Sequence, residues 1–156
     1  LEAFKDQPYL LLVATGGTHT EVLRERYPQP NIVIDDFMDY EATLPHVDLF
    51  VSSGGYGSVL LGLSHGVPLL VAGKHEGKNE IVARVGYFKL GVKLGTERPK
   101  KGQIERGARE IWANPVYAQN LARLRREFAE YDPNALSEQY IQEAVRTFEI
   151  NRRVLA

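Results

Sequence analysis

The feature of this chain best suited to chemistry is a glycine-rich turn at residues 52–58, which reads Ser-Ser-Gly-Gly-Tyr-Gly-Ser. An apolar, strand-like run precedes the turn, and a helical segment follows it directly. At such a junction the first backbone N–H groups of the helix have no partner within the helix, and the positive end of the helix dipole lies beside them. Because both features favour negative charge, the turn predicts a phosphate site.

The other candidate groups give weaker signals. Residues 15–18 (Thr-Gly-Gly-Thr) form a second glycine turn, which could bind a ligand or simply connect two elements. The turn at 52–58 could likewise be only a tight connection between a strand and a helix. The four histidines, His19, His46, His65 and His75, show no pair with the spacing of a metal site on a helix. None of them is a convincing catalytic base, so we expect neither a metal nor a catalytic residue in this chain.

The elements around these turns alternate between strand and helix. Short apolar runs predict strands at residues 9–15, 31–35, 47–52, 69–72 and 91–94. Helical spacing predicts helices at 18–27, 56–64, 103–113, 116–131 and 135–154, and one that starts at 80–85. Because the connections are too long for hairpins, the pattern predicts an α/β fold with a Rossmann-like parallel sheet flanked by helices.

In such a sheet, ligands bind beyond the carboxyl ends of the strands. Both glycine turns follow predicted strands, and so do the loops at residues 37–40 and 73–79. We therefore expect these four segments to lie on one rim of the sheet.

Composition sets broad limits on partners and location. The chain has 156 residues, which suits a single domain (1–156) with a helical C-terminal region (101–156). A formal net charge of −1 gives no basic field for nucleic acid. The absence of cysteine excludes disulfides and thiolate metal sites, and no run is long enough to span a membrane. A cytoplasmic protein is the expectation.

The segment from 31 to 94 resembles a known family. Its marks are the strand followed by GGYGS, the HGVPLL helix stop and strand, and the NEIVARV to LGVKL ending. In this order they look like the donor-binding, C-terminal half of glycosyltransferases with the GT-B architecture. The resemblance is nearest to bacterial macrolide and natural-product glycosyltransferases and to UDP-glucuronosyl- and UDP-glucosyltransferases.

The resemblance implies a nucleotide-sugar site with three parts. The diphosphate would be bound by the glycine turn and the start of its helix, the nucleoside by the loop after the second strand, and the sugar by the polar loop at 74–80. On this chain the implied residues are Ser53, Gly54, Gly55, Tyr56, Gly57 and Ser58 for the diphosphate, Phe37 and the Met38 backbone for the nucleoside, and Glu76, Asn79 and Glu80 for the sugar.

The chain departs from the family pattern at several points. Ser53 stands where many relatives carry histidine, and the sugar loop has Lys78-Asn79 where plant and animal relatives have Asp-Gln. The family's N-terminal domain, with the acceptor site and the catalytic histidine, has no counterpart here, and neither does the first strand of this half. The chain would then be a fragment of a larger two-domain enzyme, or a second copy would close its sheet in a dimer.

The expected function is therefore donor binding within an inverting glycosyltransferase. The parent enzyme would transfer a hexose from a UDP- or TDP-sugar to a hydroxyl of a small-molecule acceptor, with no metal required, and this chain alone would be inactive. Two alternatives stay open: a non-catalytic nucleotide-binding module that acts with a separate partner chain, and a nucleotide-sugar epimerase of the same architecture.

Overall fold

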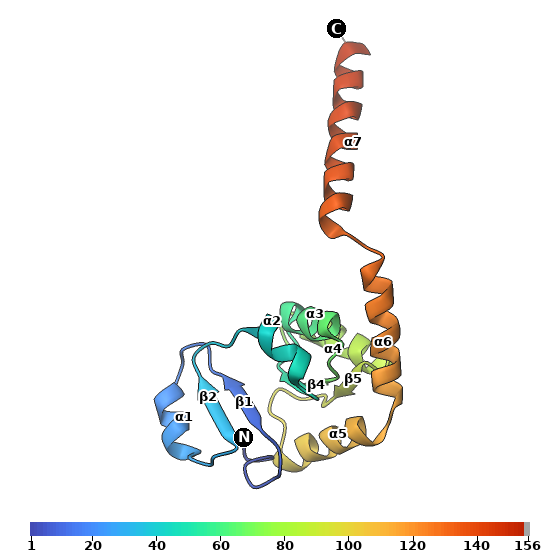
Figure 1. Ribbon diagram of the computed structural model, residues 1–156. Coiled ribbons are helices and arrows are strands. Elements are labelled where there is room, and N and C mark those ends of the chain that lie inside the picture. Colours follow the sequence, from blue (N-terminus) through green and yellow to red (C-terminus); the bar gives the residue numbers. More distant parts are fainter. Residues whose placement is uncertain (155–156) are drawn as a thin grey trace.

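The computed structural model describes residues 1–154, and the surroundings of side chains up to residue 148. Strands and helices alternate as far as the fifth strand, and three helices follow (Figure 1). The strands are β1 (Leu11–Ala14), β2 (Ile32–Asp35), β3 (Phe50–Ser52), β4 (Leu69–Val71) and β5 (Gly91–Lys93). The helices are α1 (Thr20–Arg26), α2 (Tyr40–Thr43), α3 (Tyr56–His65), α4 (Lys78–Tyr87), α5 (Lys101–Ala113), α6 (Val116–Ala129) and α7 (Pro133–Val154), with a 3-10 turn, η1 (Leu44–His46), after α2.

The five predicted strands are confirmed, but they form two parallel sheets instead of the single sheet that we expected. β1 pairs with β2, and β4 lies between β3 and β5. The sheet is divided because no described residue forms a strand that joins β1 to β3. This division agrees with the resemblance, which implies a further central strand that is not found among residues 1–154.

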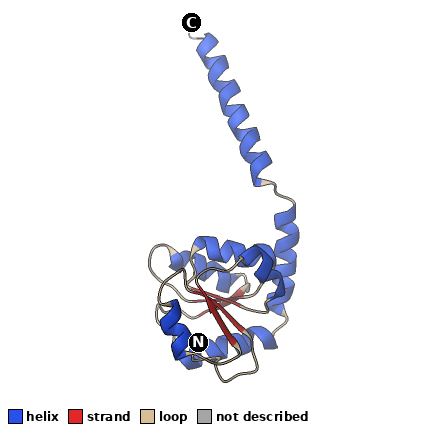
Figure 2. Cartoon of the chain, turned by 60° about the vertical axis from the view of Figure 1, so that its left-hand side comes forward, coloured by secondary structure: helices blue, strands red, loops and turns tan. Residues whose placement is uncertain are grey.

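β4 forms the centre of the main core. Its side chains alternate between two faces, as the pleat of a strand requires. Leu69 and Val71 pack against α3, α4 and Leu121 of α6, while Leu70 packs against α5 and Tyr117 of α6. Helices therefore cover both faces of the three-stranded sheet, as predicted (Figure 2).

The two-stranded sheet has a separate and smaller core. Tyr27, Ile32 and Ile34 are buried there, with Leu11, Val13 and Leu23 packed around them. On the outer faces of this sheet, Leu12 is 40% exposed and Val33 is 46% exposed. The two-stranded sheet is thus less well covered than the three-stranded one.

The last helix stands apart from the body. α7 extends away from the end of α6 (Figure 1), and it exposes a series of large apolar side chains on its length: Leu136, Tyr140, Ile141, Val145 and Phe148. None of the helices in the described part of the chain is both long and apolar enough to cross a membrane.

Candidate functional site

The glycine turn has a backbone shape that only glycine fits at its centre. Gly54 has a φ of +77°, which is the left-handed region that L-residues avoid. A Cβ on Gly54 would also lie 2.4 Å from Cγ2 of Val82, a buried residue of α4. The turn therefore packs closely against α4. Its backbone path is restricted both by the left-handed conformation of Gly54 and by this contact.

Ser52, the last residue of β3, organises the turn from within. Its hydroxyl accepts a hydrogen bond from the Gly54 N–H at 3.1 Å and lies 2.7 Å from the Ser58 hydroxyl. The Ser58 hydroxyl in turn donates to the Gly55 carbonyl at 2.9 Å. Sequence reasoning selected Ser53 and Ser58 and missed Ser52, although a hydroxyl two residues before a glycine is a common turn-forming signal.

The start of α3 leaves three backbone donors open. The helix begins at Tyr56 with Gly55 as its N-cap, and the first backbone bond runs from the Val59 N–H to the Gly55 carbonyl. The N–H groups of Tyr56, Gly57 and Ser58 precede that bond and have no acceptor among the described residues. They lie where the sequence predicts an anion site, and Ser53, which precedes them in the turn, is exposed.

The loop after β4 meets the turn directly. Gly73 lies so close to the Ser53 carbonyl oxygen that a Cβ would be only 2.3 Å from it. The structure corrects the extent of this loop, because α4 begins at Lys78 and not at residue 80. Asn79 and Glu80 are thus exposed in the first turn of α4, where helix geometry and not a flexible loop directs their side chains.

Glu76, the third predicted sugar ligand, occupies a constrained position. It adopts a φ of +57°, and its carboxylate pairs with Lys78 Nζ at 3.0 Å. The side chain of Glu76 is exposed, so the pair leaves carboxylate oxygens open to a ligand. The segment that carries the predicted sugar residues therefore follows directly from Gly73, whose backbone lies against the Ser53 carbonyl of the glycine turn.

Glu97 completes this arrangement, and sequence reasoning missed it. Its carboxylate accepts hydrogen bonds from the backbone N–H groups of Lys74 and of His75, the latter at 2.9 Å. These bonds lower the pKa of Glu97, with a smaller contribution from the nearby charges of His75 and Lys78. No sequence signal marks Glu97, which is one acidic residue in a polar stretch.

The predicted nucleoside residues belong to the other sheet. Phe37 and Met38 follow β2, and the Phe37 ring is 77% exposed beside Gly17, where a Cβ would be 3.9 Å from it. Met38 is half-buried. Phe37 therefore offers a free ring face next to the second glycine turn, while its relation to the 52–58 turn stays a prediction.

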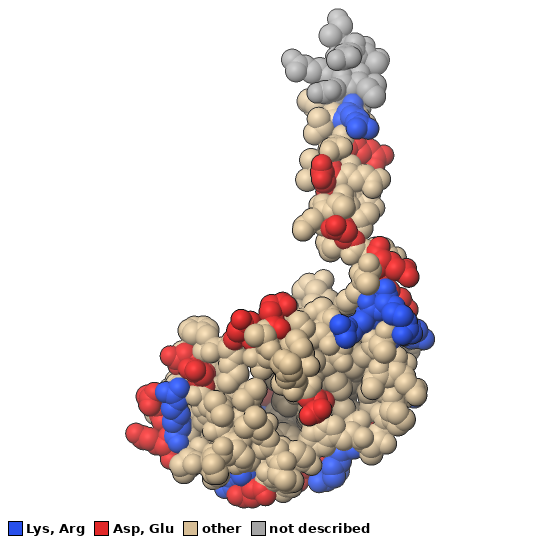
Figure 3. Space-filling view, in the orientation of Figure 1, with Lys and Arg blue, Asp and Glu red and all other residues tan. Residues whose placement is uncertain are grey.

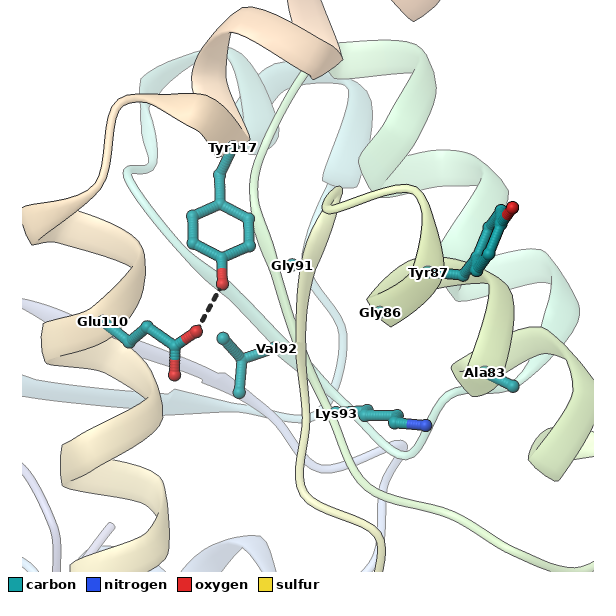
Figure 4. A pocket seen from close by; sticks show the side chains of 8 residues that line it. All are labelled: Ala83, Gly86, Tyr87, Gly91, Val92, Lys93, Glu110 and Tyr117. Carbon is teal, nitrogen blue, oxygen red and sulfur yellow. Dashed lines mark hydrogen bonds between the residues drawn. The ribbon is translucent and has the colours of Figure 1, made fainter.

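One cavity of the described chain lies away from these residues. It has a volume of about 520 Å³ and is lined by α4, β5, α5 and α6 (Figure 4). On one wall the Tyr117 hydroxyl donates to Glu110 at 2.6 Å, and burial together with this bond raises the pKa of Tyr117 to about 12. The cavity contains none of the predicted site residues, and the open amides make the glycine turn the better candidate.

Charge and metal ligands add little to the site. Lys and Arg side chains gather over the end of α6 (Figure 3), the helix that carries Arg123, Arg125 and Arg126. Arg123 pairs with Glu127 on the same helix, which fits a solvated face. Within the described residues no group of three His, Asp or Glu side chains could hold a metal ion.

Comparisons with characterised proteins show what the chain is similar to. No established family profile matches it. It is 41% identical over 124 residues to 4'-demethylrebeccamycin synthase from Lentzea aerocolonigenes, a match that covers 79% of this chain and 28% of that protein. It is 33% identical to UDP-glucosyltransferase A1 from Starmerella bombicola, over 92% of this chain and 31% of that protein. The chain therefore spans less than a third of the length of these relatives.

Solved structures share the fold. The glycotransferase of kitacinnamycin superimposes with a TM-score of 0.81 at 23% identity, over 91% of this chain and 37% of that one. Glycosyltransferase VinC, solved in complex with dTDP, gives a TM-score of 0.72 at 18% identity, over 82% of this chain and 32% of that one. These likenesses confirm the expected architecture.

Proposed function

Because this chain belongs to the glycosyltransferases with the GT-B architecture, we propose that it is their donor-binding half and holds a UDP- or TDP-sugar for transfer to an acceptor hydroxyl. The observation that carries the proposal is the open set of N–H groups at Tyr56, Gly57 and Ser58, at the start of a ten-residue helix. Three adjacent donors and the helix dipole suit a diphosphate better than a neutral ligand.

The role of these donors follows from the chemistry of transfer. When the bond between the anomeric carbon and the diphosphate breaks, negative charge grows on the departing oxygen. Donors already held in place stabilise that charge without reorganisation, and this is the term that lowers the barrier most in many enzymes. With such donors the reaction needs no metal ion, and the acceptor is deprotonated by a base from outside this chain.

The position of the sugar follows from the neighbouring loop. Glu76 in this loop, and Asn79 and Glu80 in the first turn of α4, are exposed and carry oxygen or nitrogen atoms suited to sugar hydroxyls. Phe37 would provide a stacking surface for the base. The nucleotide is proposed as UDP or TDP because relatives are named for UDP-sugars and a structural neighbour binds dTDP.

The experiment that tests this proposal is calorimetric titration of the 156-residue chain with UDP, TDP and uridine. We expect the two diphosphates to bind at micromolar to millimolar concentration and uridine to bind at least about tenfold more weakly, because the loss of the diphosphate removes charge-assisted hydrogen bonds. Equal binding of UDP and uridine would contradict a diphosphate cradle. No binding of any nucleotide at millimolar concentration would remove the donor-binding role altogether.

A further inference from the structure

Glu97 lies outside the sequence motifs, yet it bonds the segment on which the sugar contacts depend. It belongs to the connection between β5 and α5, and it contacts the connection between β4 and α4. β4 and β5 are neighbours in the sheet, so residues 22 and 23 positions apart in the chain meet at the carboxyl ends of these strands.

The connection that presents Glu97 is itself shaped by local bonds. Gly95 adopts a left-handed φ of +63°, and the Thr96 hydroxyl accepts the Arg98 N–H at 3.2 Å. These two features turn the chain so that the Glu97 side chain reaches the next connection. The carboxylate is therefore delivered by a defined turn and not by a long flexible segment.

The two N–H groups that Glu97 accepts are the first ones after Gly73. Gly73 is the residue whose backbone lies against the Ser53 carbonyl of the glycine turn. A single carboxylate that takes both the Lys74 and the His75 donors fixes the direction in which the chain leaves that contact. Such charge-assisted bonds are about twice as strong as neutral ones.

Downstream, the segment leads straight to the predicted sugar residues. The Lys78 N–H donates to the His75 carbonyl at 3.0 Å, and α4 begins there. The path of the backbone at Lys74 and His75 thus determines where α4 begins. One tight turn separates these residues from Asn79 and Glu80 in the first turn of that helix.

We infer that Glu97 is a positioning residue for the donor sugar, which sets the location of Glu76, Asn79 and Glu80 relative to the diphosphate turn. This inference rests on the proposed function. If Glu97 has this role, its loss should weaken recognition of the sugar and leave recognition of the nucleotide diphosphate nearly unchanged. A residue that only stabilised the fold would affect both ligands alike.

The test compares a nucleotide diphosphate with its sugar conjugates in three variants, using UDP, UDP-glucose, TDP and TDP-glucose as probes. Glu97→Ala removes both bonds, while Glu97→Gln keeps a carbonyl acceptor. Asp132→Ala is the matched control, because Asp132 also accepts two backbone N–H groups, at 2.9 and 3.0 Å, but at the start of α7.

We expect Glu97→Ala to weaken the best-bound sugar nucleotide by about fivefold or more, and its parent diphosphate by less than about twofold. Glu97→Gln should recover part of the loss, and Asp132→Ala should change neither affinity. In Glu97→Ala the Lys74 and His75 amide hydrogens should also exchange with solvent faster.

Three results would overturn the inference: equal loss for both ligands, no loss for either, or a wild-type chain that binds the diphosphate and its sugar conjugates equally well. A wild-type chain that binds no nucleotide at all would instead refute the proposed function. The two failures are therefore distinguishable in one set of titrations.

Discussion

The two sheets of this protein consist of similar apolar strands, yet they differ in how completely those strands are buried. In β4 the side chains of Leu69, Leu70 and Val71 are fully buried, whereas Leu12 of β1 is 40% exposed. β4 has a strand on each side and helices over both faces, while β1 has only β2 beside it. Burial thus depends on the neighbours of a strand more than on its composition, and the more deeply buried three-stranded sheet carries the glycine turn.

The largest expected effect separates the cores of the two sheets. Leu70→Ala should destabilise the protein by about 2–5 kcal/mol, because it opens a cavity between β4 and α5 that the packed surroundings cannot fill. Leu12→Ala should cost less than about 1 kcal/mol, because much of that side chain is already in water. Urea unfolding followed by circular dichroism measures both. Similar losses would show that the two-stranded sheet is as well packed as the other.

The next comparison concerns the glycine turns at the ends of β3 and β1. Gly54→Ala should cost about 3 kcal/mol, the sum of a left-handed backbone and the clash with Val82. Gly16 has a φ of +69°, and a Cβ there would meet nothing within 4 Å, so Gly16→Ala should cost only about 1 kcal/mol. The same unfolding experiment ranks them. A smaller loss at Gly54 than at Gly16 would mean that α4 does not confine the turn.

A smaller effect tests the contact between Tyr117 of α6 and Glu110 of α5. Because the pKa of Tyr117 is raised from 10 to about 12, the folded state keeps a phenol proton that the unfolded chain loses. The contribution of Tyr117 to the free energy of unfolding should therefore be fully present below pH 10, and it should decline as the pH rises toward 12.

Tyr117→Phe should remove that decline and cost about 1 kcal/mol at neutral pH, through the lost hydrogen bond to Glu110. Unfolding curves recorded from about pH 8 to about pH 12 give both values. An unchanged pH dependence in the variant would show that Tyr117 titrates normally.

The sequence predicted the order of strands and helices because local patterns determine it. The run around Leu69 is short and apolar, and Gly66 and Pro68 mark the end of the helix before it. The division into two sheets was not predictable in the same way, because it depends on which strands meet in space. The family resemblance implied that a central strand was not present. The consequence, two separate sheets, became visible only in the structure, where β1 pairs with β2 and with no other strand.

The part of the site that consists of backbone N–H groups was predictable from the sequence. Glycines at fixed spacing between a strand and a helix indicated the open donors of α3 directly. Ser52 and Glu97 were missed because their roles are tertiary: one bonds back into its own turn, and the other bonds to a segment more than twenty residues away. The start of α4 was placed two residues late, because Gly77 ends the loop with a left-handed backbone that the charged sequence around it conceals.

The central claim is that the start of α3 holds the diphosphate, and one pair of substitutions tests it most directly. Gly57 and Gly102 are each the second residue of a helix, and a Cβ would meet nothing within 4 Å at Gly57 and only the end of Arg106 at Gly102. Each change to alanine should stabilise its helix by about 0.5–1 kcal/mol. Calorimetric titration with UDP and TDP should show affinity reduced about tenfold or more in Gly57→Ala, where the methyl group occupies the space beside the open donors, and unchanged affinity in Gly102→Ala. Equal affinity in both variants would contradict the assignment of the diphosphate to this turn.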